Sequence, residues 1–242
     1  MKKSMIFAAV AAFMLVSFSA SAQFAQSSSS ALWTDTSGAE KVFNTVDFTY
    51  SPAKVTLEFG LDYNMNLNGV SLSWSQYRLI TDKLPLYLQY GAGVQYTWGE
   101  FSFLGLVGNQ MNFLSVKVPV NAVYKLAIPN TSFAVLPYVG LGLQGYILGQ
   151  SKSDSYSDFG YDEYGNYYEV TAEDGSSNLF DKDEMDGDPF NRIVLGWQIG
   201  AKVMYDRYFL GVGYEGPITR LYSGDELKVT SSQVNITLGI KF

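Results

Sequence analysis

The chain has 242 residues, with 16 Lys and Arg, 23 Asp and Glu, and neither Cys nor His. This composition excludes disulfides, thiolate nucleophiles, zinc sites built on Cys or His, and Ser-His or Cys-His catalytic pairs. Charged residues make up 16% of the sequence, whereas soluble domains usually carry about 25%. The net charge of −7 argues against nucleic acid as a partner. The length fits one large all-β domain.

The first 22 residues are predicted to be a secretory signal peptide. Lys2 and Lys3 precede an apolar run from Met5 to Val16, and Ala20-Ser21-Ala22 follows as a small-residue cleavage site. The polar stretch that begins at Ser17 comes too early for a membrane-spanning helix, which needs roughly 20 apolar residues. We therefore expect cleavage after Ala22 and export of the mature chain.

Residues 23–52 are predicted to be a flexible leader, with four consecutive serines from Ser27. Within it, residues 42–50 alternate weakly between apolar and polar side chains. A ninth strand would leave an odd number in the barrel described below, and single-chain bacterial barrels have even numbers. We therefore expect a short edge strand or plug segment that leads into Ser51-Pro52.

From residue 54 onward the chain alternates with period 2, which is the strand period. In 54–67 the odd positions are apolar, as at Val55 and Leu57, and the even positions are polar or small. The same split recurs in 70–80, 85–98, 113–126, 132–149, 190–205, 208–215 and 233–242. The stretch 70–80 fits least well, because Gln76 and Arg78 fall on its apolar side. A bulge near Gln76 would restore its pattern.

The two faces of these strands favour a transmembrane barrel over a soluble sandwich. A soluble sheet carries many charged side chains on its outward face. Here the non-apolar face is rich in Gly, Asn and Gln, and Tyr and Trp lie near the ends of the apolar face, as in the aromatic girdles of a lipid-facing band. A closed barrel leaves no backbone group unpaired in lipid. Residues 53–242 are therefore predicted to form an all-β, antiparallel eight-stranded transmembrane β-barrel in the outer membrane.

The links between the predicted strands set the orientation of the barrel. One end of the predicted barrel has short links, at 81–84, 127–131 and 206–207. The links at the other end are a tight one at 66–69 and longer ones at 99–112, 150–189 and 218–226. Outer-membrane barrels place their short turns on the periplasmic side and their long loops outside. We therefore expect both termini in the periplasm and one long acidic extracellular loop at 150–189.

Four segments carry a resemblance to known proteins: the strands 113–126 and 136–146, the run from Gly196 to Tyr214, and a final strand that ends in Phe242. Through them the chain resembles the eight-stranded outer-membrane barrel families, most closely the PorT-like barrels of Bacteroidetes-type bacteria. The resemblance implies the barrel fold and a C-terminal signal that barrel-assembly machinery reads. PorT proteins take part in protein secretion, and no motif in this chain carries that role over.

Charged side chains are predicted to line the lumen, which side chains fill in an eight-stranded barrel. Opposite charges are expected to pair there, because an unpaired buried charge is costly. We predict a structural polar ladder and no open pore, with a narrow gated ion path as the alternative. The charged residues on the non-apolar faces are Glu58, Asp62, Lys117, Lys125, Arg192, Lys202, Glu215 and Lys241.

The sequence contains no recognisable catalytic constellation. Membrane-barrel enzymes of this size use a His-assisted nucleophile or acid–base group, and the chain has no His. A carboxylate pair acting through water is another route, but no suitably placed pair can be identified. We therefore predict a structural or surface-binding role without enzymatic activity. A gated channel, a secretion-accessory barrel and a barrel enzyme are the alternatives.

The predicted loop 150–189 holds most of the negative charge. It contains 12 acidic and 2 basic residues, a formal charge of −10. It is predicted to lie outside the sheet, either as a solvated loop or as a contact surface for cations or a basic extracellular partner. Among the acids lie five tyrosines without a period-2 pattern: Tyr156, Tyr161, Tyr164, Tyr167 and Tyr168.

Four aspartates at the end of this loop suggest a calcium site. Asp181, Asp183, Asp186 and Asp188 resemble a loop in which alternate carboxylates wrap a hard cation. The spacing differs by one residue from the usual pattern, and no Glu follows five residues after Gly187. Apart from this Ca²⁺ hypothesis we expect no cofactor. The other expected partners are outer-membrane lipid and the assembly machinery.

Overall fold

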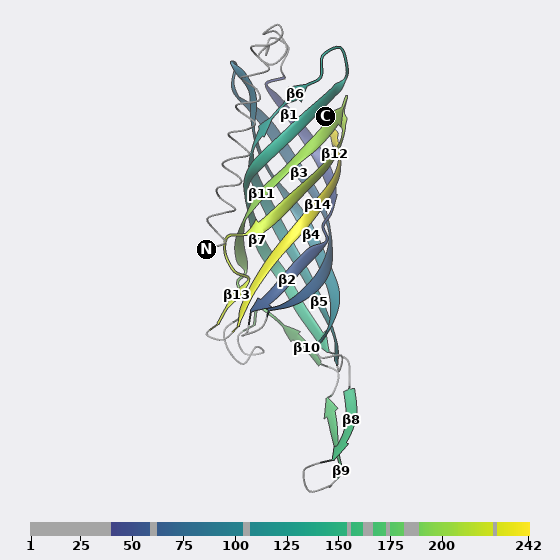
Figure 1. Ribbon diagram of the computed structural model, residues 1–242. Coiled ribbons are helices and arrows are strands. Elements are labelled where there is room, and N and C mark those ends of the chain that lie inside the picture. The colour runs from purple at the N-terminus through teal and green to yellow at the C-terminus, as the bar shows by residue number, and fades with distance from the viewer. Residues whose placement is uncertain are drawn as a thin grey trace.

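The computed structural model describes residues 40–58, 62–103, 107–153, 156–161, 167–172, 175–181, 189–224 and 227–242. They form a closed antiparallel barrel with a small hairpin beyond one end (Figure 1). The predicted signal peptide and most of the predicted leader lie outside these residues. In the described parts of the chain, no helix has the length and apolar character needed to span a bilayer.

Long, tilted strands make up the barrel wall (Figure 1). In chain order they are β1 (Val42–Tyr50), β2 (Ala53–Glu58), β3 (Asp62–Thr81), β4 (Leu84–Phe103), β5 (Val107–Tyr124), β7 (Phe133–Ser153), β11 (Ile193–Tyr205), β12 (Tyr208–Pro217) and β14 (Lys228–Lys241). Shorter strands lie at the rims or beyond them: β6 (Leu126–Ala127), β8 (Tyr156–Tyr161), β9 (Tyr167–Ala172), β10 (Gly175–Asn178) and β13 (Tyr222–Ser223).

Two of these strands, β1 and β2, share one place in the wall. They are separated at Ser51-Pro52, and both pair with β14 on one side and with β3 on the other. The nine strands of the path β1-β14-β12-β11-β7-β5-β4-β3-β2 thus occupy eight places among the described residues. The sheet closes on itself, so no long edge strand is left open. The predicted eight-stranded antiparallel barrel is confirmed.

The predicted number of strands is right, although three of the predicted elements differ from the structure. Segment 42–50, expected as an edge strand or plug, is β1, a full wall strand that pairs with β3 along its whole length. The turn expected at 66–69 is replaced by the continuous strand β3, which stays in register with β2 and β4 there. The link expected at 99–112 is mostly strand, since β4 and β5 pair out to Phe103 and Val107.

The bulge expected near Gln76 does not occur either. β3 keeps its register with β1 and β4 through Gln76, and its irregularity lies between Leu79 and Thr81. Without a bulge at this point, Gln76 and Arg78 stay on the same outward face as Leu72. The outer surface therefore carries a polar interruption near the short-turn end of β1 and β3.

Elsewhere the outward face of the barrel is an apolar belt. Leu72, Val94, Val212 and Leu238, for example, are 51–61% exposed. Aromatic pairs lie near both ends of this belt: Phe133 with Tyr205 near the short turns, and Tyr96 with Trp98 and Trp197 with Tyr214 near the long loop. Such a belt between aromatic girdles is the lipid-facing surface of an outer-membrane barrel. The protein is therefore an integral outer-membrane barrel, and the periplasmic position of its short turns stays a prediction.

Beyond the aromatic girdle on the long-loop side the wall continues, but there its inward face is apolar and its outward face is polar. On β2 and β3 the inward side chains Val55, Met65 and Leu67 are only 2–3% exposed, whereas Lys54 and Glu58 point outward and are exposed. Here water replaces lipid outside, so the apolar face turns inward as in a soluble sheet. The prediction that Val55 faces lipid and Glu58 faces the lumen is wrong for this reason.

Candidate functional site

The interior of the barrel is divided into three layers along its axis. Along the inward face of β3, apolar Leu67 is followed by Ser71, Ser73 and Ser75, and then by Tyr77. The loop-end apolar layer consists of Ala53, Val55, Met65, Leu67, Phe113, Leu179, Phe180, Phe190, Leu221 and Val229. The short-turn apolar layer consists of Phe43, Tyr77, Tyr87, Val123, Ala134, Leu136, Met204 and Phe209. A polar layer lies between them.

The loop-end layer is completed by residues of the long acidic segment. β10 pairs with β7, and the Leu179 amide donates to the Gly149 carbonyl at 3.0 Å. A Cβ on Gly149 would lie only 2.3 Å from the Phe180 ring, so this close approach requires glycine. Phe190 is tied in turn by a 3.0 Å bond from its amide to the Leu179 carbonyl. The ends of the segment predicted as an external loop are thus a packed lid.

The short-turn layer is formed by the barrel wall itself. Phe43 stacks on Tyr77 with ring centroids 4.5 Å apart and meets Tyr87 edge-on at 5.5 Å. Phe209 packs so closely over Gly239 that a Cβ there would lie 2.1 Å from the ring. Because these side chains are carried by paired wall strands, this layer cannot move away with the loop.

Two lysines and a glutamate lie at the short-turn mouth. The ammonium groups of Lys125 and Lys241 are 5.9 and 5.4 Å from the Phe43 ring centroid, and Lys241 forms an ion pair with Glu40 at 2.5 Å. Lys125 follows the last residue of β5. Burial, and then the nearby charge of Lys241, lower the pKa of Lys125. This cluster covers the outer side of the short-turn layer.

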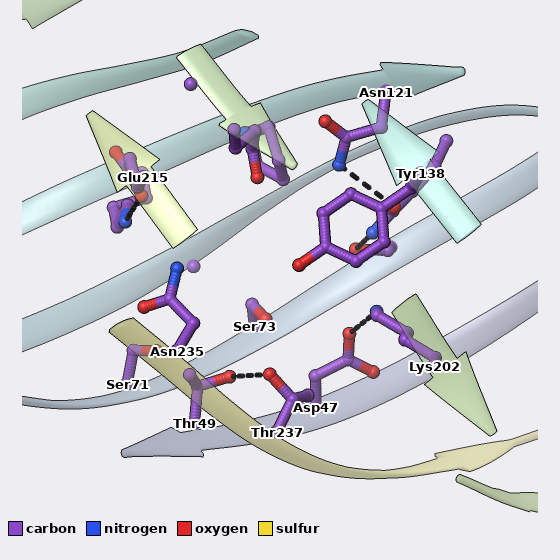
Figure 2. Close-up of a pocket in the computed structure, with 17 residues that line it drawn as sticks. Asp47, Thr49, Ser71, Ser73, Asn121, Tyr138, Lys202, Glu215, Asn235 and Thr237 are labelled. Carbon is purple, nitrogen blue, oxygen red and sulfur yellow. Dashed lines mark hydrogen bonds and ion pairs between the residues drawn. The ribbon is translucent and has the colours of Figure 1, made fainter. Parts of the chain in front are cut away.

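The polar layer contains a small cavity of about 80 Å³. Figure 2 shows Asp47, Lys202 and Glu215 around it, with the Tyr138 ring pointing inward. One water needs roughly 10–15 Å³ of such space, so the cavity has room for several. The other lining groups are mostly hydroxyl and amide side chains, including Thr49, Ser71, Ser73, Gln198, Asn235 and Thr237.

The charges of the polar layer form two cross-strand ion pairs. Lys202 Nζ lies 3.1 Å from Asp47 Oδ2 and donates to the Tyr77 hydroxyl at 2.9 Å. Lys117 pairs with Glu215, whose Oε2 also accepts from Gln233 Nε2 at 2.8 Å. A buried pair of this kind is tolerated when each charge is compensated by its partner and by further hydrogen bonds. Among the described residues, the four charged groups that line the cavity are thus engaged in pairs.

The structure brings together only part of the predicted ladder. Lys117, Lys202 and Glu215 line the cavity, whereas Glu58 and Arg192 have exposed side chains. Glu58 points outward for the reason given above. Arg192 precedes β11, and its guanidinium lies over the Phe180 ring at 5.0 Å. Lys125 is at the short-turn mouth, and the side chain of Asp62 is outside the described part of the structure.

Sequence reasoning missed Asp47, the partner of Lys202. It lies on β1, which was expected to be a plug segment. The signal was present, since Thr45, Asp47 and Thr49 alternate with Val46 and Phe48 in the same way as in the recognised strands. The requirement for an even number of strands outweighed it.

The acidic segment is more ordered than predicted. Residues 156–161 and 167–172 pair as the hairpin β8–β9, with Tyr161 directly opposite Tyr167 and Gly160 opposite Tyr168. The expectation of a loop without strands is therefore wrong here. Figure 1 shows this hairpin beyond the end of the barrel, past β10. Tyr164 lies outside the described residues, and a contact role for the five tyrosines stays a prediction.

The proposed calcium site falls largely outside the described chain, since only Asp181 of its four aspartates is described. In the portions that are described, no three His, Cys, Asp or Glu side chains are grouped as a metal site would require. Asp183, Asp186 and Asp188 lie outside the described residues. The Ca²⁺ hypothesis stays a prediction.

No protein-family model matches the chain, and no curated protein matches it. Among solved structures, the chain is similar to the attachment invasion locus protein Ail of Yersinia pestis, with 14% identity, a TM-score of 0.39, and coverage of 84% of this chain and 100% of Ail. It is also similar to Neisserial surface protein A, with 16% identity, a TM-score of 0.42, and coverage of 84% of this chain and 100% of that protein. A third similar structure is the outer-membrane enzyme PagL, with 15% identity, a TM-score of 0.37, and coverage of 79% of this chain and 98% of PagL. The barrel assignment rests on the closed strand order and the outward apolar belt of this chain, not on these similarities.

Proposed function

We propose that this protein is a closed outer-membrane barrel without a conducting pore, which acts as a rigid scaffold for a binding surface at its extracellular end. The observation that carries the proposal is the three-layered interior, in which apolar side chains fill the lumen on both sides of a small polar cavity. An ion would have to cross both layers, where mostly apolar side chains would replace its water shell. Desolvating a charge in this way is strongly unfavourable.

The two layers differ in origin, and this difference makes the proposal testable. The loop-end layer is completed by Phe180 of the long segment and by Phe190, which directly follows that segment, whereas the short-turn layer belongs entirely to the wall. If both layers block the lumen, removing the loop-end layer alone leaves the barrel closed. A gated channel opened by movement of the loop predicts the opposite result.

Planar-bilayer recordings of the purified protein test this directly. We expect no single-channel steps from the wild type or from Phe180→Ala/Phe190→Ala. Steps are expected only when Phe43→Ala, Tyr77→Ala and Tyr87→Ala are added, provided that this variant keeps heat-modifiable mobility on gels. Stable steps in the wild type, altered by Lys117→Ala, would instead establish the gated path.

The binding surface proposed for this scaffold is the acidic segment, because loops on a rigid scaffold commonly carry recognition. Its formal charge of −10 favours a basic partner or cations, and such binding weakens with salt. Binding of a cationic reporter protein to whole cells, compared at roughly 0.05 and 0.5 M salt, tests this. Binding that is unaffected by salt, or by replacing β8–β9 with a short linker, contradicts it.

Catalysis and secretion are less well supported alternatives. The charged groups of the cavity neutralise one another in pairs, and both apolar layers separate them from solvent. We therefore propose that the protein is not an enzyme. The resemblance to PorT-like barrels remains the basis for a secretion-accessory role, and a secretion defect after gene deletion would favour that role over the scaffold.

A further inference from the structure

A second surface on this protein is carried by the wall and is independent of the acidic segment. Just beyond the loop-side aromatic girdle, the outward face of β3 presents Asn64, Asn66 and Asn68 at successive outward positions. Asn is disfavoured in strands, and a solvated sheet face usually carries Lys, Glu and Thr instead. Three asparagines in a row are therefore a feature that requires an explanation.

The asparagine row continues across the neighbouring strands. Asn68 lies directly opposite Trp98 on β4, and Trp98 lies opposite Asn112 on β5. Tyr96 and Trp98 stack with ring centroids 5.7 Å apart and an angle of 19° between their planes. The result is a flat surface on which amides surround a pair of aromatic rings, at the boundary between the lipid belt and the protruding wall.

Three of the four amides on this surface, those of Asn64, Asn68 and Asn112, are each held in one orientation by a hydroxyl donor. Thr56 Oγ1 donates to Asn64 Oδ1 at 2.9 Å, the Tyr50 hydroxyl to Asn68 Oδ1 at 2.7 Å, and the Tyr96 hydroxyl to Asn112 Oδ1 at 3.0 Å. Each bond uses the carbonyl oxygen of the amide. The Nδ2 groups, which are pure donors, have no hydrogen-bond partner within the described structure. Successive outward positions on a strand are about 6.7 Å apart, so the donors form a regular row.

We propose that this surface binds the saccharide head group of an outer-leaflet glycolipid. Neutral amide donors match the hydroxyl and ring oxygens of a sugar, and an aromatic face matches the apolar C–H face of a sugar ring. A phosphate site would instead be built on clustered Arg or Lys, whereas on the described strand β2 a single cation, Lys54, pairs with the row, opposite Asn66. The position immediately outside the lipid belt is where such a head group lies. The inference depends on the outer-membrane location, with the long-loop end of the barrel outside, and not on the closed lumen.

Native mass spectrometry of the detergent-purified barrel tests the proposal. The protein is offered equal amounts of a rough-type lipopolysaccharide and phosphatidylglycerol, and the bound lipids are counted. The wild type is expected to retain the glycolipid in preference to the phospholipid. The variant Asn64→Ala/Asn66→Ala/Asn68→Ala is expected to bind the glycolipid at least about tenfold more weakly, since each of three lost hydrogen bonds contributes about 0.5–1 kcal/mol and 1.4 kcal/mol is tenfold.

The chain offers a matched control on the same sheet. Asn44 and Gln76 are also outward amides on β1 and β3, joined by a 3.1 Å hydrogen bond at the opposite end of the barrel. Asn44→Ala/Gln76→Ala is therefore expected to keep the glycolipid preference. If the triple variant does not show the gel mobility of a folded barrel, the single variant Asn66→Ala serves as the test of glycolipid binding instead. No hydrogen bond to the Asn66 side chain is found among the described residues, so its replacement should not disturb the fold. For this single variant we expect a loss of about twofold to fivefold.

Several outcomes would overturn the proposal. These are equal retention of both lipids by the wild type, an equal loss in the control variant, or unchanged glycolipid binding in the triple variant. A free core oligosaccharide should compete for the surface, and failure to compete would mean that the acyl chains alone hold the glycolipid. If the triple variant loses a co-purifying protein but keeps the glycolipid, the surface is a protein contact and the assignment is wrong.

Discussion

Lys202 and Asp47 show how a single charged pair fixes the packing of opposite walls. They join β11 to β1 across the lumen, and their side chains are only 8% and 5% exposed. The ammonium is also 4.9 Å from the centroid of the Phe209 ring. In Lys117 and Glu215, by contrast, the side chains are 17% and 10% exposed. Removing one partner from the more buried pair leaves an uncompensated charge with less exposure than in the other pair.

The first prediction compares these two pairs. Asp47→Asn is expected to lower the free energy of unfolding by about 3–5 kcal/mol, because it strands the Lys202 charge. Glu215→Gln, the matched control, is expected to lower it by only about 1–3 kcal/mol, since the Lys117 side chain is 17% exposed and that of Lys202 only 8%. The double variant Asp47→Leu/Lys202→Met should recover most of the first loss. Urea titrations followed by gel mobility measure all three, and equal losses in the two single variants would contradict this ranking.

Sequence reasoning at the residue scale succeeded where the strand was correctly assigned. Lys117, Lys202 and Glu215 were found because period 2 places them on the inward face of strands within the lipid belt. Glu58 was misplaced because the same period does not tell which face meets lipid. The pairing of Lys202 with Asp47 depends on strand order, which a single sequence does not contain.

At the scale of an element, β3 shows why alternation alone is ambiguous. Its apolar positions are odd up to Leu67 and even from Val70 onward. In the sequence, this change of phase predicts a turn at 66–69. In the structure the backbone continues unbroken, and it is the medium outside the wall that changes from water to lipid. A phase change within one strand can therefore mark a membrane boundary, with the apolar side facing inward above it and outward below it.

The second prediction follows from this inversion. Met65 is 2% exposed within the loop-end layer, so Met65→Asn is expected to cost about 3 kcal/mol through lost burial and an unsatisfied amide. Asn66 is exposed, and Asn66→Leu should change the free energy of unfolding by less than about 0.5 kcal/mol. If residues 54–67 faced lipid as the sequence predicts, the order of the two effects would be reversed. Urea titrations of the two variants distinguish these cases.

On the scale of the whole molecule, the long acidic segment has two separate structural roles. Its ends form the lid, in which β10 pairs with β7 and Phe180 enters the loop-end layer together with Phe190, which directly follows the segment. Its middle part is the hairpin β8–β9, whose strands pair only with each other among the described strands. Stability should therefore reside in the lid and recognition in the hairpin. The charge of the segment gave no sign of this division, because the buried aromatic residues that define the lid lie next to acidic ones.

The third prediction separates these two roles. Replacing residues 155–173 with a short Gly-Ser linker is expected to leave the free energy of unfolding within about 0.5 kcal/mol of the wild type, because the barrel and lid keep their contacts. Phe180→Ala is expected to cost about 3–5 kcal/mol, since it removes a buried ring from a packed layer. Protease treatment of whole cells should cleave the wild-type hairpin and spare the linker variant, while gel mobility reports the barrel in each case. If the linker variant were destabilised as much as Phe180→Ala, the hairpin would have to pack on the barrel, and its assignment as the displayed part of the segment would be wrong.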